Sequence, residues 1–152
     1  MKCLLCMVEN ETHSHLFFNC AYSRRLWERL KPMALLNSIS NNWASIISGV
    51  TNRPAVNKIW SVIQRLVFGA SIYFVWQERN MRYHQHKVRE VDVLFDLIVE
   101  TVRMKVRGLN LKSTNDVIKA SGIWNFPISK NVKYQDTVKE LNGLNFFNDD
   151  HS

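Results

Sequence analysis

Every cysteine of this chain lies within its first twenty residues, and this clustering constrains the fold more than any other feature of the sequence. The segment CLLCMVENETHSHLFFNC, residues 3–20, contains three cysteines and two histidines. Cys3 and Cys6 have the C-x2-C spacing that lets two thiolates on one tight turn face a single ion, and Cys20 supplies a third thiolate. We therefore expect the N-terminal segment to fold around a metal ion.

The fourth ligand is expected to be a histidine. His15 gives the pattern C-x2-C-x8-H-x4-C, whereas His13 would give six intervening residues on both sides. We favour His15, because four residues between the histidine and the last cysteine are typical of compact zinc knuckles, and we keep His13 as the alternative. A set of three cysteines and one histidine satisfies a tetrahedral Zn²⁺ ion and leaves no position for a substrate, so the predicted role of the zinc is structural.

Two other interpretations of the cysteines stay open. The three thiols could be unliganded small hydrophobic side chains, or Cys3 and Cys6 could form a redox pair, although the βαβ pattern that accompanies a thioredoxin-like pair is not visible. An odd number of cysteines cannot all pair within the chain, and the N-terminus does not resemble a signal peptide. We therefore expect an intracellular, reducing compartment and no disulfide scaffold.

Beyond the cysteines, the hydrophobic residues recur with the period of helices, which predicts a mainly α fold. The pattern indicates a small N-terminal zinc knuckle (1–22), a helical domain continuous with it (23–127) that is built on a long central helical hairpin, and a flexible tail (128–152). The expected helices are 21–33, 41–50, 55–87, 91–108 and 113–122. Pro32 is expected to stop the first helix, Gly108 to terminate the fourth, and Ser113 and Asp116 to form a capping box at the start of the fifth. Residues 123–130 are expected to be extended.

The longest apolar stretch, residues 59–76, is predicted to be a buried core helix. Gln64 and Arg65 interrupt it near its middle, and a central arginine is costly in a membrane, so we expect no membrane span. The following residues are polar, which predicts that this helix leaves the core near Arg79. All five tryptophans are expected to pack in the core, and of Phe17 and Phe18 one is expected to point inward and one outward. The tryptophans are Trp27, Trp43, Trp60, Trp76 and Trp124.

The basic side chains point to a polyanionic partner. The net charge is +7 and the pI is near 9.5, which favours attraction to RNA, DNA or an anionic surface. Two clusters are expected at opposite ends of the hairpin, and contact with phosphate and simple solvation are equally good interpretations of both. The candidate nucleic-acid-binding residues are Arg79, Arg82, Lys87 and Arg89 in the first cluster and Arg103, Lys105 and Arg107 in the second.

The segment CLLCMVENETHSHLFFNCAYSRRLW resembles the zinc-binding domain found downstream of the reverse transcriptase in plant LINE-type (non-LTR) retrotransposons. VWQERNMRYH resembles the Trp-x-Glu-Arg-Asn-x-Arg segment of that family, and VRMKVRGLNLKSTNDV followed by IWNFP resembles its C-terminal part. The similarity covers residues 2–127 and is most specific over residues 3–27. The matching positions there include Glu11, Thr12, His15, Leu16, Phe17, Phe18, Cys20, Ser23 and Trp27.

The resemblance implies a zinc-binding module that assists a polymerase in holding RNA or DNA, at the family's presumed nuclear site of integration. The chain has no Tyr-x-Asp-Asp polymerase box, and its one Asp-Asp pair is Asp149 and Asp150. We therefore expect a non-catalytic chain without a small-molecule substrate, and we expect it to be the end of a longer element whose catalytic domains it lacks. The alternative is a structural or protein-interaction domain, such as a retroelement relic, that binds no nucleic acid.

Overall fold

The structure is a computed structural model that describes residues 1–37, 45, 48 and 59–128. Within these residues the chain is mainly helical, and its extended pairing is limited to an isolated bridge between Lys2 and Asn10. The elements are a short π-helix, η1 (His15–Asn19), and four α-helices: α1 (Ala21–Met33), α3 (Ile59–Gln85), α4 (Val91–Arg107) and α5 (Asn115–Trp124). The predicted mainly α fold with an N-terminal cysteine cluster is confirmed.

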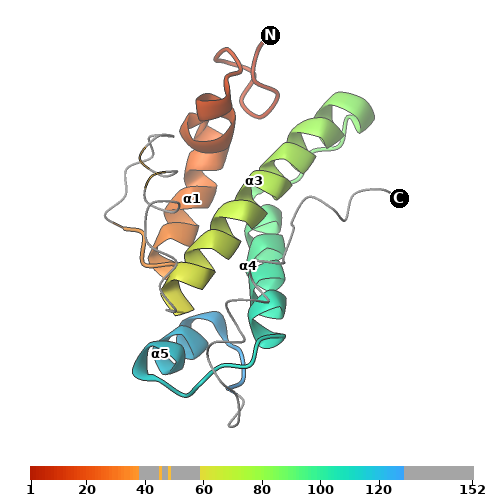
Figure 1. Cartoon of the computed structure of the whole chain (residues 1–152). Helices are drawn as coiled ribbons and strands as arrows, with labels where there is room; N and C mark the ends of the chain where they lie inside the picture. The colour runs from red at the N-terminus through yellow and green to blue at the C-terminus, as the bar shows by residue number, and fades with distance from the viewer. Residues whose placement is uncertain (38–44, 46–47, 49–58, 129–152) are drawn as a thin grey trace.

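Helices α3 and α4 form the predicted hairpin, and the other elements pack against it. In Figure 1, α3 runs between α1 and α4, and α5 lies at the opposite end of the helices from the N-terminus. α4 contacts α1 as well as α3, and η1 contacts both α1 and α3. The N-terminal loop therefore meets the helices at the C-terminal end of α3, which is where the polar residues of that helix begin.

The first helix follows its amphipathic pattern. Leu26, Trp27 and Leu30 are buried, whereas Arg24 and Arg25 are exposed. The predicted stop is confirmed to within a residue, because Pro32 lies in the last turn and the helix ends at the next position. A proline there removes only one N–H group from a helix that is already ending.

The limits of α4 also agree with the sequence. The helix ends at Arg107 and is capped by Gly108, which has a φ of −73° and is therefore not in the left-handed conformation of most glycine caps. The face that the periodicity predicts is buried at Val91, Leu94, Ile98 and Val102. Burial of this stripe against α1 and α3 is the main apolar contact that holds the bundle together.

The prediction for α5 was wrong at both ends. Its N-cap is Thr114, whose hydroxyl accepts a hydrogen bond from the Val117 N–H group, and Ser113 does not cap it. The helix continues past Gly122 to Trp124 and ends at Asn125 in the left-handed conformation. An interior glycine costs about 1 kcal/mol. Burial of the Trp124 ring and its N–H bond to the Met33 carbonyl, at 2.8 Å, offset that cost.

The predicted aromatic core is correct in part. Trp27, Trp60 and Trp124 are buried, and the predicted role of Phe126 in fixing the chain to the core agrees with its burial. Trp76 is 45% exposed, so its assignment to the core was wrong. Phe17 and Phe18 are both buried, and the prediction that one of them faces outward was also wrong. Trp43, most of the predicted helix at 41–50 and the tail from residue 129 lie outside the described residues.

By length and composition alone, helix α3 is long and apolar enough to cross a membrane. No other helix in the described part of the chain meets this criterion. Half of its most apolar window is buried within the protein, and α3 contacts α4, α5 and η1. Gln64 donates a hydrogen bond to the Ala34 carbonyl at 3.0 Å, which satisfies the amide in the interior. These contacts are those of a core helix.

Candidate metal centre

The first ten residues fold into a tight loop that turns Cys3 and Cys6 to the same side. The Cys3 N–H group donates to the Glu9 carbonyl at 2.8 Å, and the Met7 N–H group donates to the Cys3 carbonyl at 2.7 Å. Met7 takes a left-handed conformation with a φ of 59°, which is uncommon for any residue other than glycine. The chain therefore reverses immediately after Cys6, as the C-x2-C spacing predicts.

A π-helical turn brings the other two candidate ligands together. The Cys20 N–H group donates to the His15 carbonyl at 2.7 Å, which is the i to i+5 bond of a π-helix. Thr12 starts this turn, because its hydroxyl accepts a hydrogen bond from the His15 N–H group at 3.1 Å. The Trp27 indole N–H donates to the Phe17 carbonyl at 2.8 Å and so holds the turn against α1.

The four side chains meet at one point. Their ligand atoms, in Cys3, Cys6, His15 and Cys20, all lie within 4.8 Å of one another. The Cys3 and Cys20 sulfurs are 3.9 Å apart, and the Cys6 sulfur is 3.4 Å from His15 Nε2. Ligands at normal zinc distances in a tetrahedron would be about 3.8 Å apart for two sulfurs and about 3.6 Å for sulfur and nitrogen. The spacing is therefore that of a four-ligand metal site, and the three cysteines form no disulfide.

His15 rather than His13 belongs to this cluster. The His15 ring is buried, and its Nδ1 atom lies 3.3 Å from a carboxylate oxygen of Glu9, which leaves Nε2 directed at the sulfurs. A carboxylate on the other ring nitrogen is the usual support of a metal-binding histidine. His13 is exposed and lies beside Phe17, with the two ring centroids 6.5 Å apart. Glu9 was not singled out from the sequence.

The thiol groups differ in acidity because their surroundings differ. Burial opposes ionisation of Cys6, but hydrogen bonds from the backbone of Glu9 and Val8 and from His15 outweigh it and lower its pKa to about 6. Burial, reinforced by the negative charges of the other two cysteines, raises the pKa of Cys20 to about 12. Thiolates this close repel one another, and a divalent cation among them would offset that repulsion.

Two arginines of α3 fasten the N-terminal loop to the helices. Arg79 donates two hydrogen bonds to the Glu11 carboxylate, both at 3.1 Å. Arg82 Nη1 donates to the carbonyls of Leu4 and Leu5, at 3.2 and 3.0 Å, within the turn that separates Cys3 from Cys6. The arginines therefore fix the loop in position from outside the ligand set.

Arg82 and Arg89 are held by Glu78, which is fully buried. Its carboxylate accepts hydrogen bonds from Arg82 at 3.2 Å, from the Arg89 guanidinium at 2.9 Å and from the Arg89 N–H group at 2.6 Å. The prediction that α3 leaves the core near Arg79 agrees with the burial pattern, because Glu78 is the last buried residue of the helix and Tyr83 is 53% exposed. The polar pattern there combines an ion network around Glu78 with exposed side chains at the end of the helix.

The predicted nucleic-acid-binding residues divide into two kinds. The guanidinium groups of Arg79, Arg82, Arg89 and Arg103 bond within the protein; Arg103 contacts Glu100 and the Trp124 carbonyl. The exposed members are Lys87, just beyond α3, and Arg107, at the end of α4, whereas Lys105 is half-buried. The structure does not bring the two basic clusters together, since they lie at opposite ends of α4.

The candidate ligands were predicted from their spacing in the sequence, but the contacts that hold the N-terminal loop against α3 were not predicted. The partner of Arg79 is Glu11, 68 positions away, and Arg82 reaches carbonyl groups 77 and 78 positions away. The acidic residues of the loop and the basic residues of α3 were the visible signal, but no pattern in the sequence pairs them.

Comparison of the chain with known protein families, curated proteins and solved structures finds no match.

Proposed function

We propose that the chain is a non-catalytic zinc-binding module that assists RNA or DNA binding, as its resemblance to the zinc-binding domain of plant LINE-type reverse transcriptases implies. The observation that carries the proposal is the cluster of three cysteines and His15, whose ligand spacing fits a tetrahedral ion. Three sulfurs and one nitrogen favour Zn²⁺ over the hard cations, which prefer oxygen ligands.

The zinc would be held by Cys3, Cys6, His15 and Cys20, and with four protein ligands it supplies structure and no open position for chemistry. Glu9 would orient His15, while Arg79 and Arg82 hold the loop against α3. These arginines therefore position the module, and we assign the phosphate contacts to exposed cations such as Lys87 and Arg107.

A second candidate function is a structural or protein-interaction domain that binds no nucleic acid. The observation that favours it is the engagement of four of the seven predicted nucleic-acid-binding side chains in contacts within the protein. These four arginines already use some of their N–H donors within the protein, which leaves fewer of them for a phosphate. The two candidates differ in whether the isolated chain binds a polyanion in a salt-dependent way.

The zinc is tested by elemental analysis of the purified chain, which we expect to contain one equivalent. Nucleic-acid binding is tested by fluorescence anisotropy with labelled single-stranded RNA and DNA across a range of salt concentrations. Changing both Lys87 and Arg107 to Gln should reduce the slope of log affinity against log salt by about 0.7 for each phosphate that the protein no longer neutralises.

Lys119→Gln is the matched control, since Lys119 is also an exposed cation, on α5, and the proposal does not use it. It should leave the salt slope unchanged. A wild-type protein that carries zinc but binds neither oligonucleotide at low salt would reject nucleic-acid binding and favour the second candidate.

A further inference from the structure

Trp76 is the exposed tryptophan among the described residues, and it borders two hollows on the surface. The larger hollow has a volume of about 720 Å³ and the smaller about 310 Å³, and Trp76 lines both. The Arg79 guanidinium lies 5.1 Å from the centroid of the Trp76 ring and is itself bonded to Glu11. The surface therefore carries a large, accessible aromatic ring beside a cation that is held in place by an ion pair.

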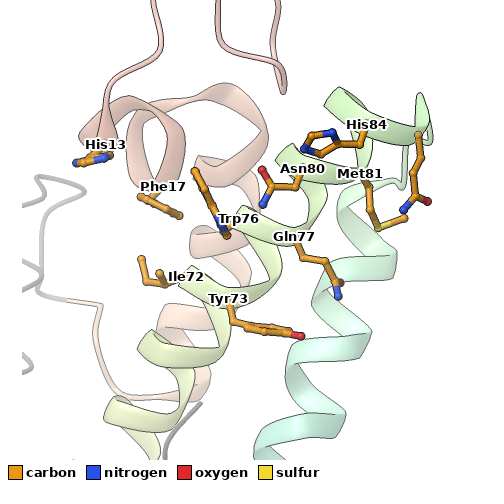
Figure 2. A pocket seen from close by; sticks show the side chains of 10 residues that line it. His13, Phe17, Ile72, Tyr73, Trp76, Gln77, Asn80, Met81 and His84 are labelled. Carbon is orange, nitrogen blue, oxygen red and sulfur yellow. The ribbon is translucent and has the colours of Figure 1, made fainter. Parts of the chain in front are cut away.

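The larger hollow combines aromatic rings with amide groups. Figure 2 shows His13 and Phe17, from the N-terminal segment, on one side of Trp76, and Asn80 and Gln77, from α3, on the other. The Phe17 and Trp76 ring centroids are 6.4 Å apart. The amide oxygens of Asn80 and Gln77 accept hydrogen bonds from Arg79 and Arg89, at 3.1 and 3.0 Å, so these amides would offer their NH2 donors to a ligand. An aromatic face beside amide donors matches an unpaired nucleobase, which offers a π surface and a hydrogen-bonding edge.

The charge around this hollow also suits a nucleic acid. The described residues that line the larger hollow include no aspartate or glutamate, whereas the smaller one contains Glu11. Lys87 is an exposed residue, and its backbone N–H group donates a hydrogen bond at 3.4 Å to the backbone carbonyl of Met81, one of the residues that line the larger hollow. A cation at this position in the fold would be available to the phosphate that follows a base bound at Trp76.

We infer that the larger hollow binds an unpaired base of single-stranded nucleic acid by stacking it on Trp76, with Asn80 and Gln77 at the base edge and Lys87 at the backbone. The inference rests on the proposed nucleic-acid binding and gives it a site. It also gives the metal a role in binding, because His13 and Phe17 lie between the ligands Cys6 and Cys20 and form one wall of the hollow.

The test is anisotropy with the zinc-loaded chain and matched single-stranded RNA and DNA oligonucleotides, whose relative affinities identify the preferred nucleic acid. Loss of one stacked base should make Trp76→Ala bind about 5- to 150-fold more weakly, and Trp76→Phe should retain part of the affinity. An oligonucleotide with an abasic tract should bind the wild type as weakly as the complete oligonucleotide binds Trp76→Ala. The salt slope should stay the same, because no phosphate contact is removed.

The control is Ile118→Ala, which removes an exposed apolar side chain from α5 without touching the hollow. All variants are compared at equal zinc content and helicity, so that a folding defect is not mistaken for a binding defect. If the wild type binds and Trp76→Ala binds equally well, the stacking site is rejected while the proposed function stands. If the wild type binds no oligonucleotide at low salt, the proposed function fails, and the stacking site fails with it.

Discussion

The N-terminal loop and the helical hairpin are held together by different forces. Residues 1–14 bury only two apolar side chains, those of Cys3 and Leu5, and rely on backbone hydrogen bonds and on two arginines of α3. The hairpin buries continuous apolar stripes from both helices. We therefore expect this short segment, with so little apolar surface to bury, to depend on a metal ion to stay folded, and we expect the hairpin to be stable without one.

The largest expected effect is local, and it separates the two regions. Chelation of the metal, or Cys20→Ser, should unfold residues 1–20, because metal binding supplies the folding free energy of such a site. Hydrogen exchange should show loss of protection in this segment, while α4 stays protected. His15→Ala should behave in the same way, and His13→Ala is the matched control that should retain the zinc.

A protein in which α4 lost protection together with the loop would contradict this separation. So would a protein in which the Cys3 and Cys20 N–H groups stayed protected after the metal had been removed. The first result would make the two regions one cooperative unit, and the second would make the loop independent of the ion.

The second prediction concerns the hairpin, where the effect should be global. Leu94 is fully buried on α4, and Leu94→Ala should lower the free energy of unfolding by about 2 to 5 kcal/mol through reduced burial and the cavity that remains. Urea denaturation measures this change as a lower midpoint. Val93→Ala, at an exposed neighbouring position, is the control. Zinc content that fell along with stability would show that the hairpin also determines the metal site.

The contrast explains which features the sequence could predict. The four candidate ligands lie within a segment of eighteen residues, so their spacing alone predicted that the three cysteines and a histidine would cluster. The burial of Leu94, Ile98 and Val102 follows from helical periodicity for the same local reason. The cap at Thr114 was missed by one position, since neighbouring serine and threonine residues can both cap a helix.

Other features depend on contacts between distant segments, and no local pattern reports them. Helix α3 is apolar on most sides, so its periodicity does not identify a solvent-facing stripe. The apolar pattern therefore predicts a core position for Trp76, but this side chain is exposed. The sequence around Glu78 favours a polar surface or interhelical position for this residue. It is fully buried because Arg82 and Arg89 neutralise it, and Arg89 is eleven positions farther along the chain.

The third prediction concerns the place where the two regions meet. Glu78→Gln keeps the shape of the side chain but removes the charge that Arg82 and Arg89 share, so it should cost about 3 kcal/mol, the lower end of the range for breaking a buried ion pair. Both arginines keep partial exposure, which limits the loss. Arg82 also holds the Leu4 and Leu5 carbonyls, so its release should weaken zinc affinity as well as global stability.

Glu100→Gln, in the exposed pair with Arg103, is the control and should change neither quantity by more than about 0.5 kcal/mol. Equilibrium urea denaturation and competition with a zinc chelator measure the two quantities separately. A loss of stability with unchanged zinc affinity would mean that the metal site does not depend on the arginines that contact it, and the loop would then be held by its four ligands alone.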